Sequence, residues 1–80
     1  MIYYYRTRVG TFWIKPQPGV HGRWLLGIDA EALGSYASPN MAAGDVFSHA
    51  TGHFEWDCLA GEQLDVPETV AEWNRGRPDV

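Results

Sequence analysis

The sequence predicts an α+β fold: an antiparallel sheet of three to four strands packed on one main helix, with a short C-terminal helix. Residues 1–37 contain many aromatic and β-branched residues that alternate in polarity with a period of two, as strands do. From Ser38 onward, apolar residues recur at helical spacing. The charged residues are divided along the chain in a similar way. Residues 1–28 contain basic but no acidic residues, whereas residues 29–72 contain nine carboxylates and no Lys or Arg. The sequence therefore predicts a basic, aromatic sheet followed by acidic helices.

The length and composition indicate one folded domain that spans residues 1–80. A chain of 80 residues buries only roughly 60 to 65% of the surface of its unfolded form, so we expect a thin margin of stability. Hydrophobic residues make up 45% of the chain and aromatic residues 14%, which excludes the composition of a disordered protein. The chain has no internal repeat and no linker, so a second domain is not predicted.

Cysteine content and hydropathy predict a cytoplasmic protein. The single cysteine, Cys58, cannot form an internal disulfide, and no charged segment followed by an apolar run marks the N-terminus as a secretion signal. No apolar stretch approaches the roughly 20 residues that cross a bilayer, which excludes the membrane-spanning class. The net charge of −4 argues against a general nucleic-acid coat, although a local basic field remains in the first third of the chain.

The predicted sheet occupies about residues 2–37. Gly10 interrupts the first alternating run and is either a turn or a bulge. Residues 16–22 contain two prolines without N–H donors and two glycines that favour reversal, which indicates a hairpin loop. The predicted strands are residues 2–9, 11–15, 23–29 and 32–37.

The main helix is predicted over about residues 38–51. The Ser38 hydroxyl is suited to cap the first free N–H groups, Pro39 has no N–H to satisfy, and Gly52 is a good stop. Gly44 costs the helix about 1 kcal/mol relative to Ala, which indicates a close approach of the helix backbone to the sheet. Residues 52–64 are predicted to be irregular. A capping box that starts at Asp65 predicts a short helix over about residues 65–74, followed by a frayed tail over residues 75–80.

Strand alternation places a set of basic and aromatic side chains on the sheet face opposite the helix. Such a face has three interpretations: an ordinary solvated face, a nucleic-acid surface or a protein-binding surface. We favour a small non-enzymatic binding or regulatory module that acts through contacts with an unidentified protein partner. DNA or RNA binding by the same face is the alternative, and a homodimer that hides the face is a further one. The predicted binding residues are Tyr4, Arg6, Arg8, Trp13, Lys15 and Arg23.

The segment from His49 to Cys58 contains residue types that bind metals or act as nucleophiles. His49 and His53 are four residues apart, which places them on one helical face only if the helix continues past Gly52. Since Gly52 is expected to end the helix, the two histidines are not expected to point together, and we predict no metal site and no cofactor. Nothing in the sequence fixes Cys58, Asp57 and the histidines in a catalytic geometry, and a domain of this size has little room for a substrate pocket, so we predict no catalytic residue. His53 is expected to pack or to cap the helix end, and Cys58 is expected to be a small buried hydrophobe.

The order of three strands and a helix over residues 11–52 resembles the AP2-type and integrase arm-type domains. The residues that carry this likeness are Trp13, Trp24, Gly34-Ser35-Tyr36, Ser38-Pro39 and Ala42-Ala43. Those domains bind DNA through the exposed face of the sheet, so the resemblance implies a DNA-binding face here.

Most of the chain also resembles a group of small uncharacterised bacterial proteins. This likeness implies a standalone bacterial protein and adds no activity. It rests on Gly10-Thr11-Phe12, Leu33-Gly34-Ser35-Tyr36, Ser38-Pro39, Ala42-Ala43, Val66-Pro67 and Glu72-Trp73.

Overall fold

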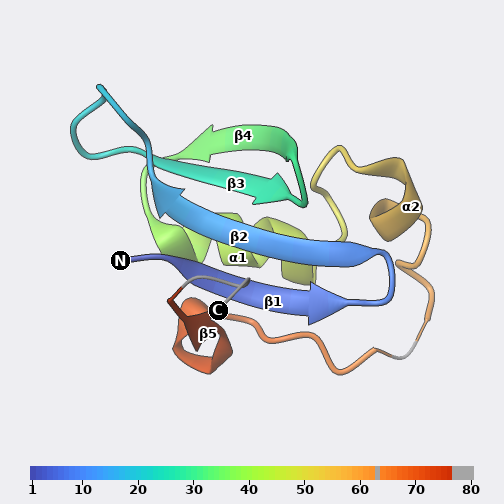
Figure 1. Ribbon diagram of the computed structural model, residues 1–80. Coiled ribbons are helices and arrows are strands. Elements are labelled where there is room, and N and C mark those ends of the chain that lie inside the picture. Colours follow the sequence, from blue (N-terminus) through green and yellow to red (C-terminus); the bar gives the residue numbers. More distant parts are fainter. Residues whose placement is uncertain (63, 77–80) are drawn as a thin grey trace.

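The computed structural model describes residues 1–62 and 64–76, and it confirms the α+β class (Figure 1). Five strands form one antiparallel sheet in the order β4-β3-β2-β1-β5, with one main helix, α1, packed against it. Within the described part of the chain, no helix has the length and apolarity that a membrane span requires. The elements are β1 (Tyr3–Thr7), β2 (Gly10–Pro16), β3 (Trp24–Ile28), β4 (Glu31–Tyr36), α1 (Pro39–Phe47), α2 (Phe54–Asp57), the 3₁₀ turn η1 (Val70–Glu72) and β5 (Asn74–Arg75).

Glycine marks the tightest point of the β1–β2 hairpin. Arg8 and Val9 form a two-residue turn between the paired residues Thr7 and Gly10. Gly10 has a φ of 146°, and a Cβ there would lie 2.5 Å from Oδ2 of Asp29. Only glycine fits this position without a shift. Gly10 is therefore a turn residue that opens β2, and the register irregularity of the sheet lies instead between β3 and β4.

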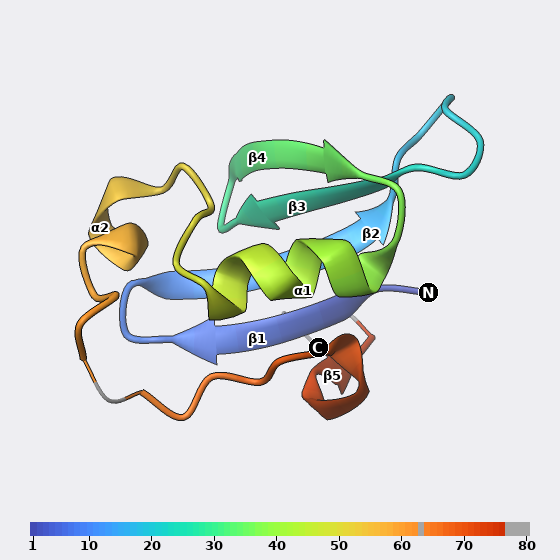
Figure 2. The same cartoon turned by 180° about the vertical axis from the view of Figure 1, so that it is seen from behind.

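The core lies between the sheet and α1, which crosses one face of the sheet (Figure 2). Phe12 is buried and its neighbour Trp13 is on the opposite face, so the predicted strand register is confirmed. A slip of one residue would have exchanged the two side chains. The residues buried in this core are Phe12, Ile14, Leu26, Ile28, Ala42, Ala43, Val46, Trp56, Val70 and Trp73.

Tyr36 joins the end of β4 to α1. Its hydroxyl donates a hydrogen bond of 2.6 Å to Oδ2 of Asp45. Burial raises the pKa of the Tyr36 phenol, and the bond to the Asp45 carboxylate raises it further. The phenol therefore stays protonated and keeps this link at neutral pH.

The helix α1 begins as predicted but ends four residues earlier than residue 51. The Ser38 hydroxyl accepts a hydrogen bond of 3.2 Å from Met41 N. At the other end, His49 has a φ of 55°, Ala50 N donates to Asp45 O at 2.9 Å, and His49 N donates to Val46 O at 3.2 Å. This pattern is a Schellman motif with histidine where glycine is usual.

A tertiary contact explains why the helix stops at histidine. The His49 ring stacks on Trp56, with 4.5 Å between ring centroids and 16° between planes. Its Nδ1 also lies 2.9 Å from Trp56 O. These contacts hold His49 in the left-handed conformation, so Gly52 lies beyond the helix instead of ending it.

The predicted short helix over residues 65–74 is wrong. Only Val70–Glu72 form a 3₁₀ turn, and Asn74–Arg75 pair with β1 as strand β5. Pro67 disfavours helical geometry in the preceding residue, and Asn40 Oδ1 accepts the bond from Val70 N. The segment predicted as irregular contains the one-turn helix α2. The predicted frayed tail over residues 75–80 is wrong at its start, because Arg75 belongs to β5 and Gly76 N donates to Ile2 O at 2.8 Å. Residues 77–80 of the tail, and Gln63, lie outside the described residues.

Candidate functional site

The sheet face opposite α1, here called the open face, is not covered by any helix of the described chain. It faces the viewer in Figure 1, with α1 behind the sheet. Cross-strand pairs define it, because directly paired residues share a face. Tyr4 pairs with Trp13, Trp13 with Gly27, and Lys15 with Leu25. The open face therefore includes Tyr4, Arg6, Thr11, Trp13, Lys15, Leu25, Gly27, Ala32, Ser35 and Asn74.

Trp13 lies directly on the backbone of Gly27. A Cβ at Gly27 would lie only 1.9 Å from Cζ2 of the indole, so this contact requires glycine. The indole Nε1 donates a hydrogen bond of 2.8 Å to Asp29 O. Because the ring is held at both points, it loses little conformational entropy when a ligand covers it. Trp13 is therefore a pre-organised aromatic platform.

Two cations lie beside aromatic rings on the open face. Lys15 Nζ is 5.1 Å from the Trp13 ring centroid, and Arg6 Cζ is 4.9 Å from the Tyr4 ring centroid. Both separations are within the range of cation–π attraction. The platform therefore carries positive charge, which favours a ligand with an acidic group.

The structure brings together four of the six predicted binding residues: Tyr4, Arg6, Trp13 and Lys15. Arg23 lies at the loop end of β3, where its Nε donates to Ser35 Oγ at 3.1 Å and its Nη2 to Ser35 O at 2.9 Å. Arg8 belongs to the β1–β2 turn rather than to a strand. Its Nη2 forms an exposed ion pair of 2.7 Å with Glu62. The structure therefore separates Arg8 from these four residues and places Arg23 at the edge of the open face, beside Ser35.

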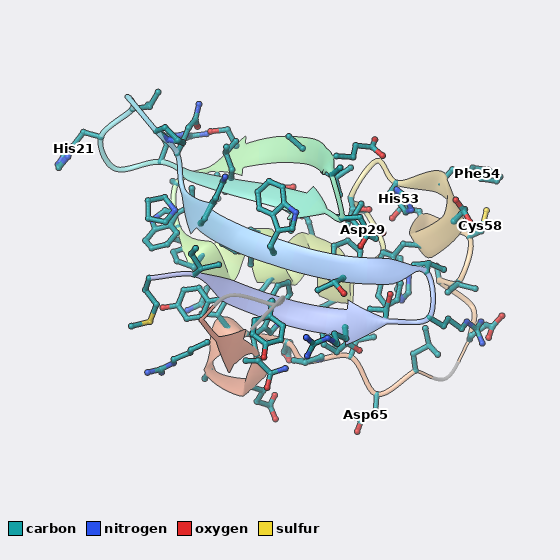
Figure 3. The ribbon with its side chains drawn as sticks, viewed as in Figure 1. His21, Asp29, His53, Phe54, Cys58 and Asp65 are labelled. Atoms are coloured by element: carbon teal, nitrogen blue, oxygen red, sulfur yellow. The ribbon has the colours of Figure 1, made fainter. Side chains whose placement is uncertain are left out.

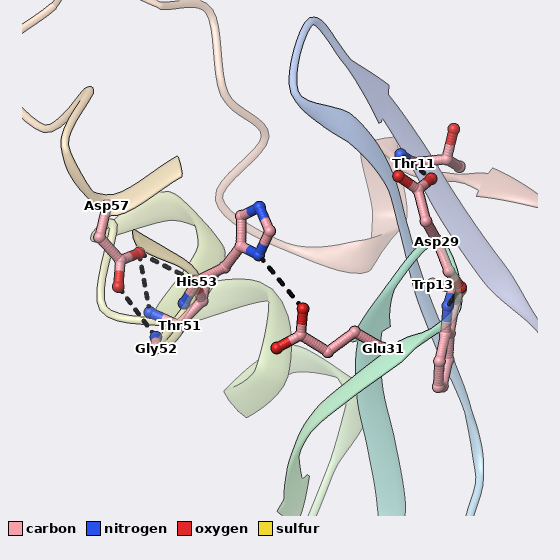
Figure 4. A network of polar contacts seen from close by, with 8 residues as sticks. All are labelled: Thr11, Trp13, Asp29, Glu31, Thr51, Gly52, His53 and Asp57. Carbon is pink, nitrogen blue, oxygen red and sulfur yellow. Dashed lines mark hydrogen bonds and ion pairs between the residues drawn. The ribbon is translucent and has the colours of Figure 1, made fainter. Parts of the chain in front are cut away.

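Asp29 positions the platform and is not among the predicted binding residues. It has a φ of 49° in the turn between β3 and β4. Asp29 N donates a hydrogen bond to Thr11 O, and Asp29 Oδ1 accepts one from Thr11 N, both at 3.0 Å (Figure 4). Its carbonyl then faces Trp13. Aspartate tolerates left-handed backbone in turns, so its place between two strand patterns was a usable signal.

The loop between β2 and β3 projects from the end of the sheet (Figure 1). Gln17 N donates to Arg23 O at 2.9 Å and closes the base of this loop. The loop borders an open hollow of about 540 Å³, which Arg23 connects to the open face. The residues that line the hollow are Pro16, Gln17, Gly19, Val20, His21, Gly22, Arg23 and Trp24.

A second polar cluster holds the link between α1 and α2 (Figure 4). The Asp57 carboxylate accepts hydrogen bonds from Thr51 N at 3.1 Å, Thr51 Oγ1 at 2.8 Å and Gly52 N at 2.9 Å. His53 Nδ1 lies 3.7 Å from Oε1 of Glu31, the first residue of β4. These contacts fix a chain reversal, and they give the cluster a structural role.

The histidines and the cysteine do not form a common site. His49 contacts Trp56 and His53 contacts Glu31. Among the residues that the structure describes, no three His, Cys, Asp or Glu side chains are placed to hold a metal ion. Cys58 is exposed at the end of α2, beside the exposed Phe54 (Figure 3), so the expectation of a buried cysteine is wrong.

Comparison with protein-family models, with curated proteins and with solved structures finds no match. The function of the open face must therefore be argued from its own geometry. The family resemblances named above stay predictions.

Proposed function

We propose that this chain is a small, non-enzymatic binding module that holds a protein partner on the open face of its sheet. The observation that carries the proposal is the Trp13 platform, fixed on Gly27 and bonded to Asp29 O. Trp, Tyr and Arg are the residues that most often dominate binding energy at protein interfaces. Trp13, Tyr4 and Arg6 supply all three types on adjacent strands.

The charge of the platform indicates the chemistry of the partner. Lys15 and Arg6 lie over the two rings, so a complementary surface presents a carboxylate next to an apolar side chain. The apolar group would cover the indole, and the carboxylate would meet a cation at its border. We therefore expect a short acidic and apolar segment as the recognised element.

Nucleic-acid binding is the second candidate, because a base can stack on an aromatic ring while a nearby cation contacts phosphate. Trp13 with Lys15 offers that combination. However, Arg8 pairs with Glu62, and Arg23 is bonded to Ser35. Affinity for nucleic acid comes mainly from several phosphate contacts, and these two arginines are already engaged within the chain. The protein partner is therefore the first choice.

The proposal is tested by selecting peptides from a random library on the native chain and measuring their affinity by calorimetry. Trp13→Ala should weaken binding at least about 30-fold, the loss typical of an interface hot spot. Trp13→Phe, which keeps a ring but loses the bond to Asp29 O, should give a smaller loss. Phe54→Ala is the matched control, because Phe54 is 79% exposed on α2, away from the sheet.

Amide NMR shifts show which surface the selected peptides use. The proposal requires shifts at Tyr4, Trp13 and Lys15 in the native chain. Equal affinity of the native and Trp13→Ala chains, with circular dichroism confirming that both are folded, would reject the open face as the binding surface.

A further inference from the structure

One side of α1 is turned away from the sheet (Figure 2). The residues of α1 make this side apolar and nearly uncharged. Met41 is 57% exposed and Phe47 is 45% exposed on it. The helix contains no Lys, Arg or Glu, and its one charged residue, Asp45, is bonded to the Tyr36 hydroxyl. An exposed helix normally carries charged residues on its outer side. This surface, here called the outer face of α1, consists of Asn40, Met41, Gly44, Phe47 and Ser48.

Gly44 lies near the centre of the outer face. The sequence predicts that this glycine brings the helix backbone close to the sheet, and that prediction is wrong. A Cβ at Gly44 would have no neighbour within 4 Å apart from the helix itself. Glycine is the least favourable helix residue after proline, so position 44 carries a cost that no contact of the described chain explains. Close approach of a second backbone would explain it.

The outer face is symmetric about Gly44. Met41 and Phe47 each lie three residues away, or about 4.5 Å along the helix axis in opposite directions. When two copies of α1 cross in antiparallel orientation at Gly44, Met41 of one copy is level with Phe47 of the other. A twofold axis produces this contact twice, as an isologous interface requires. The surface is therefore complementary to itself.

We propose that this chain forms a weak homodimer through an antiparallel contact between the outer faces of two α1 helices, centred on Gly44. A second copy is the favoured occupant because the face offers no charge that would select another partner, and its apolar residues match across a twofold axis. Nine helical residues span only about 14 Å, so the contact is small and the dissociation constant should lie between about 10 μM and about 1 mM. The proposal does not depend on the open face, which lies on the other side of the sheet.

Sedimentation velocity measures the dimer from about 1 μM to about 1 mM chain. The native chain should convert from monomer to dimer across this range. Gly44→Gln should abolish the dimer while circular dichroism stays native, because glutamine is a good helix former but too large for a close crossing. Gly61→Gln is the matched control and should dimerise like the native chain, since Gly61 is an exposed glycine with open space around it and lies outside α1.

A charge exchange tests the antiparallel geometry. Met41→Lys and Phe47→Glu should each weaken the dimer at least about tenfold. The chain with both substitutions should dimerise more strongly than either single variant. Each introduced ammonium is then level with an introduced carboxylate of the other copy. The two positions are about 9 Å apart along one helix, so the recovery cannot come from a pair within one chain.

Three results would overturn the proposal. The first is a native chain that stays monomeric up to about 1 mM. The second is a dimer that Gly44→Gln leaves unchanged, which would place the contact elsewhere. The third is a double variant that dimerises no better than the weaker single variant, which would exclude the antiparallel pairing.

Discussion

The tryptophan side chains of this molecule differ in what their indole N–H groups bind. Trp13 Nε1 donates to Asp29 O, and Trp56 Nε1 donates to Val46 O at 3.0 Å. Trp73 Nε1 is buried and has no hydrogen-bond partner among the described residues. A buried donor without a partner costs about 1–3 kcal/mol. The indole of Trp73 thus contributes packing and carries a polar penalty, whereas that of Trp56 contributes both packing and a bond.

Replacing each of the two buried tryptophans by phenylalanine should separate these effects. Trp56 is 1% exposed and Trp73 is 4% exposed, so Trp56→Phe and Trp73→Phe remove similar buried atoms. Trp56→Phe also removes the hydrogen bond to Val46 O, whereas Trp73→Phe removes a buried N–H that has no partner among the described residues. We expect Trp56→Phe to lower the free energy of unfolding by about 1–3 kcal/mol more than Trp73→Phe does. Urea unfolding of the native and variant chains measures the difference, and equal losses would show that the Trp73 N–H is satisfied.

Local alternation was sufficient to predict the sheet face on which most of the proposed binding residues lie. The period of two placed Tyr4, Arg6, Trp13 and Lys15 together because the side-chain direction in a strand depends only on position along it. Arg8 was misplaced because the strand ends at Thr7, where the hairpin turn begins. Its partner Glu62 is 54 residues away in the chain, so no local pattern could reveal the pair. The fixed position of the Trp13 ring was equally hidden, since it needs Gly27 and Asp29 from the neighbouring strand and its turn.

Whole elements were predicted well where their signals are local and poorly where tertiary contacts decide. The Ser38 cap and the four main strands follow from their own residues. The end of α1 was missed because stacking on Trp56 holds His49 in a conformation that glycine usually takes. The two-residue strand β5 was missed because it exists only through pairing with β1. Such a short strand has no periodic pattern of its own.

The link between α1 and α2 depends on the carboxylate of Asp57, and replacing this residue tests the link. Asp57→Ala removes the acceptor of three hydrogen bonds from Thr51 and Gly52. Since bonds to a charged group contribute about 1.5–3 kcal/mol each before the loop relaxes, we expect a loss of at least about 2 kcal/mol in the free energy of unfolding. Amide hydrogen exchange should become faster at Thr51 and Gly52. Glu55→Ala is the control, because Glu55 is exposed in the same helix. An equal loss in the free energy of unfolding for Glu55→Ala would show that the hydrogen bonds of Asp57 do not hold the link.

Across the whole molecule, most basic residues lie in or beside the sheet, whereas most acidic residues lie in the segments around it, with Glu31 of β4 as an exception. Contacts between the two parts include the Arg8–Glu62 pair and the approach of Tyr36 to Asp45. The open face keeps Arg6 and Lys15 beside its aromatic rings on one side of the sheet. The outer face of α1 lies on the other side (Figure 2). A dimer formed through α1 would therefore leave both open faces available and present two binding surfaces to partners.

Because the first third of the chain is basic, the salt dependence of any nucleic-acid binding decides between a nucleic acid and a protein as the ligand. Short single-stranded and duplex oligonucleotides are titrated into the labelled chain at about 50 mM and about 200 mM salt, with amide NMR as the measurement. We expect no saturable shifts at Tyr4, Trp13 or Lys15 at either concentration, because a protein is the proposed ligand of the open face. If Arg6 and Lys15 do contact phosphates, two such contacts should weaken binding about tenfold over this range. Saturable shifts on the open face that fade by that factor, and that Lys15→Gln reduces while Arg8→Gln does not, would make nucleic acid the ligand in place of a protein.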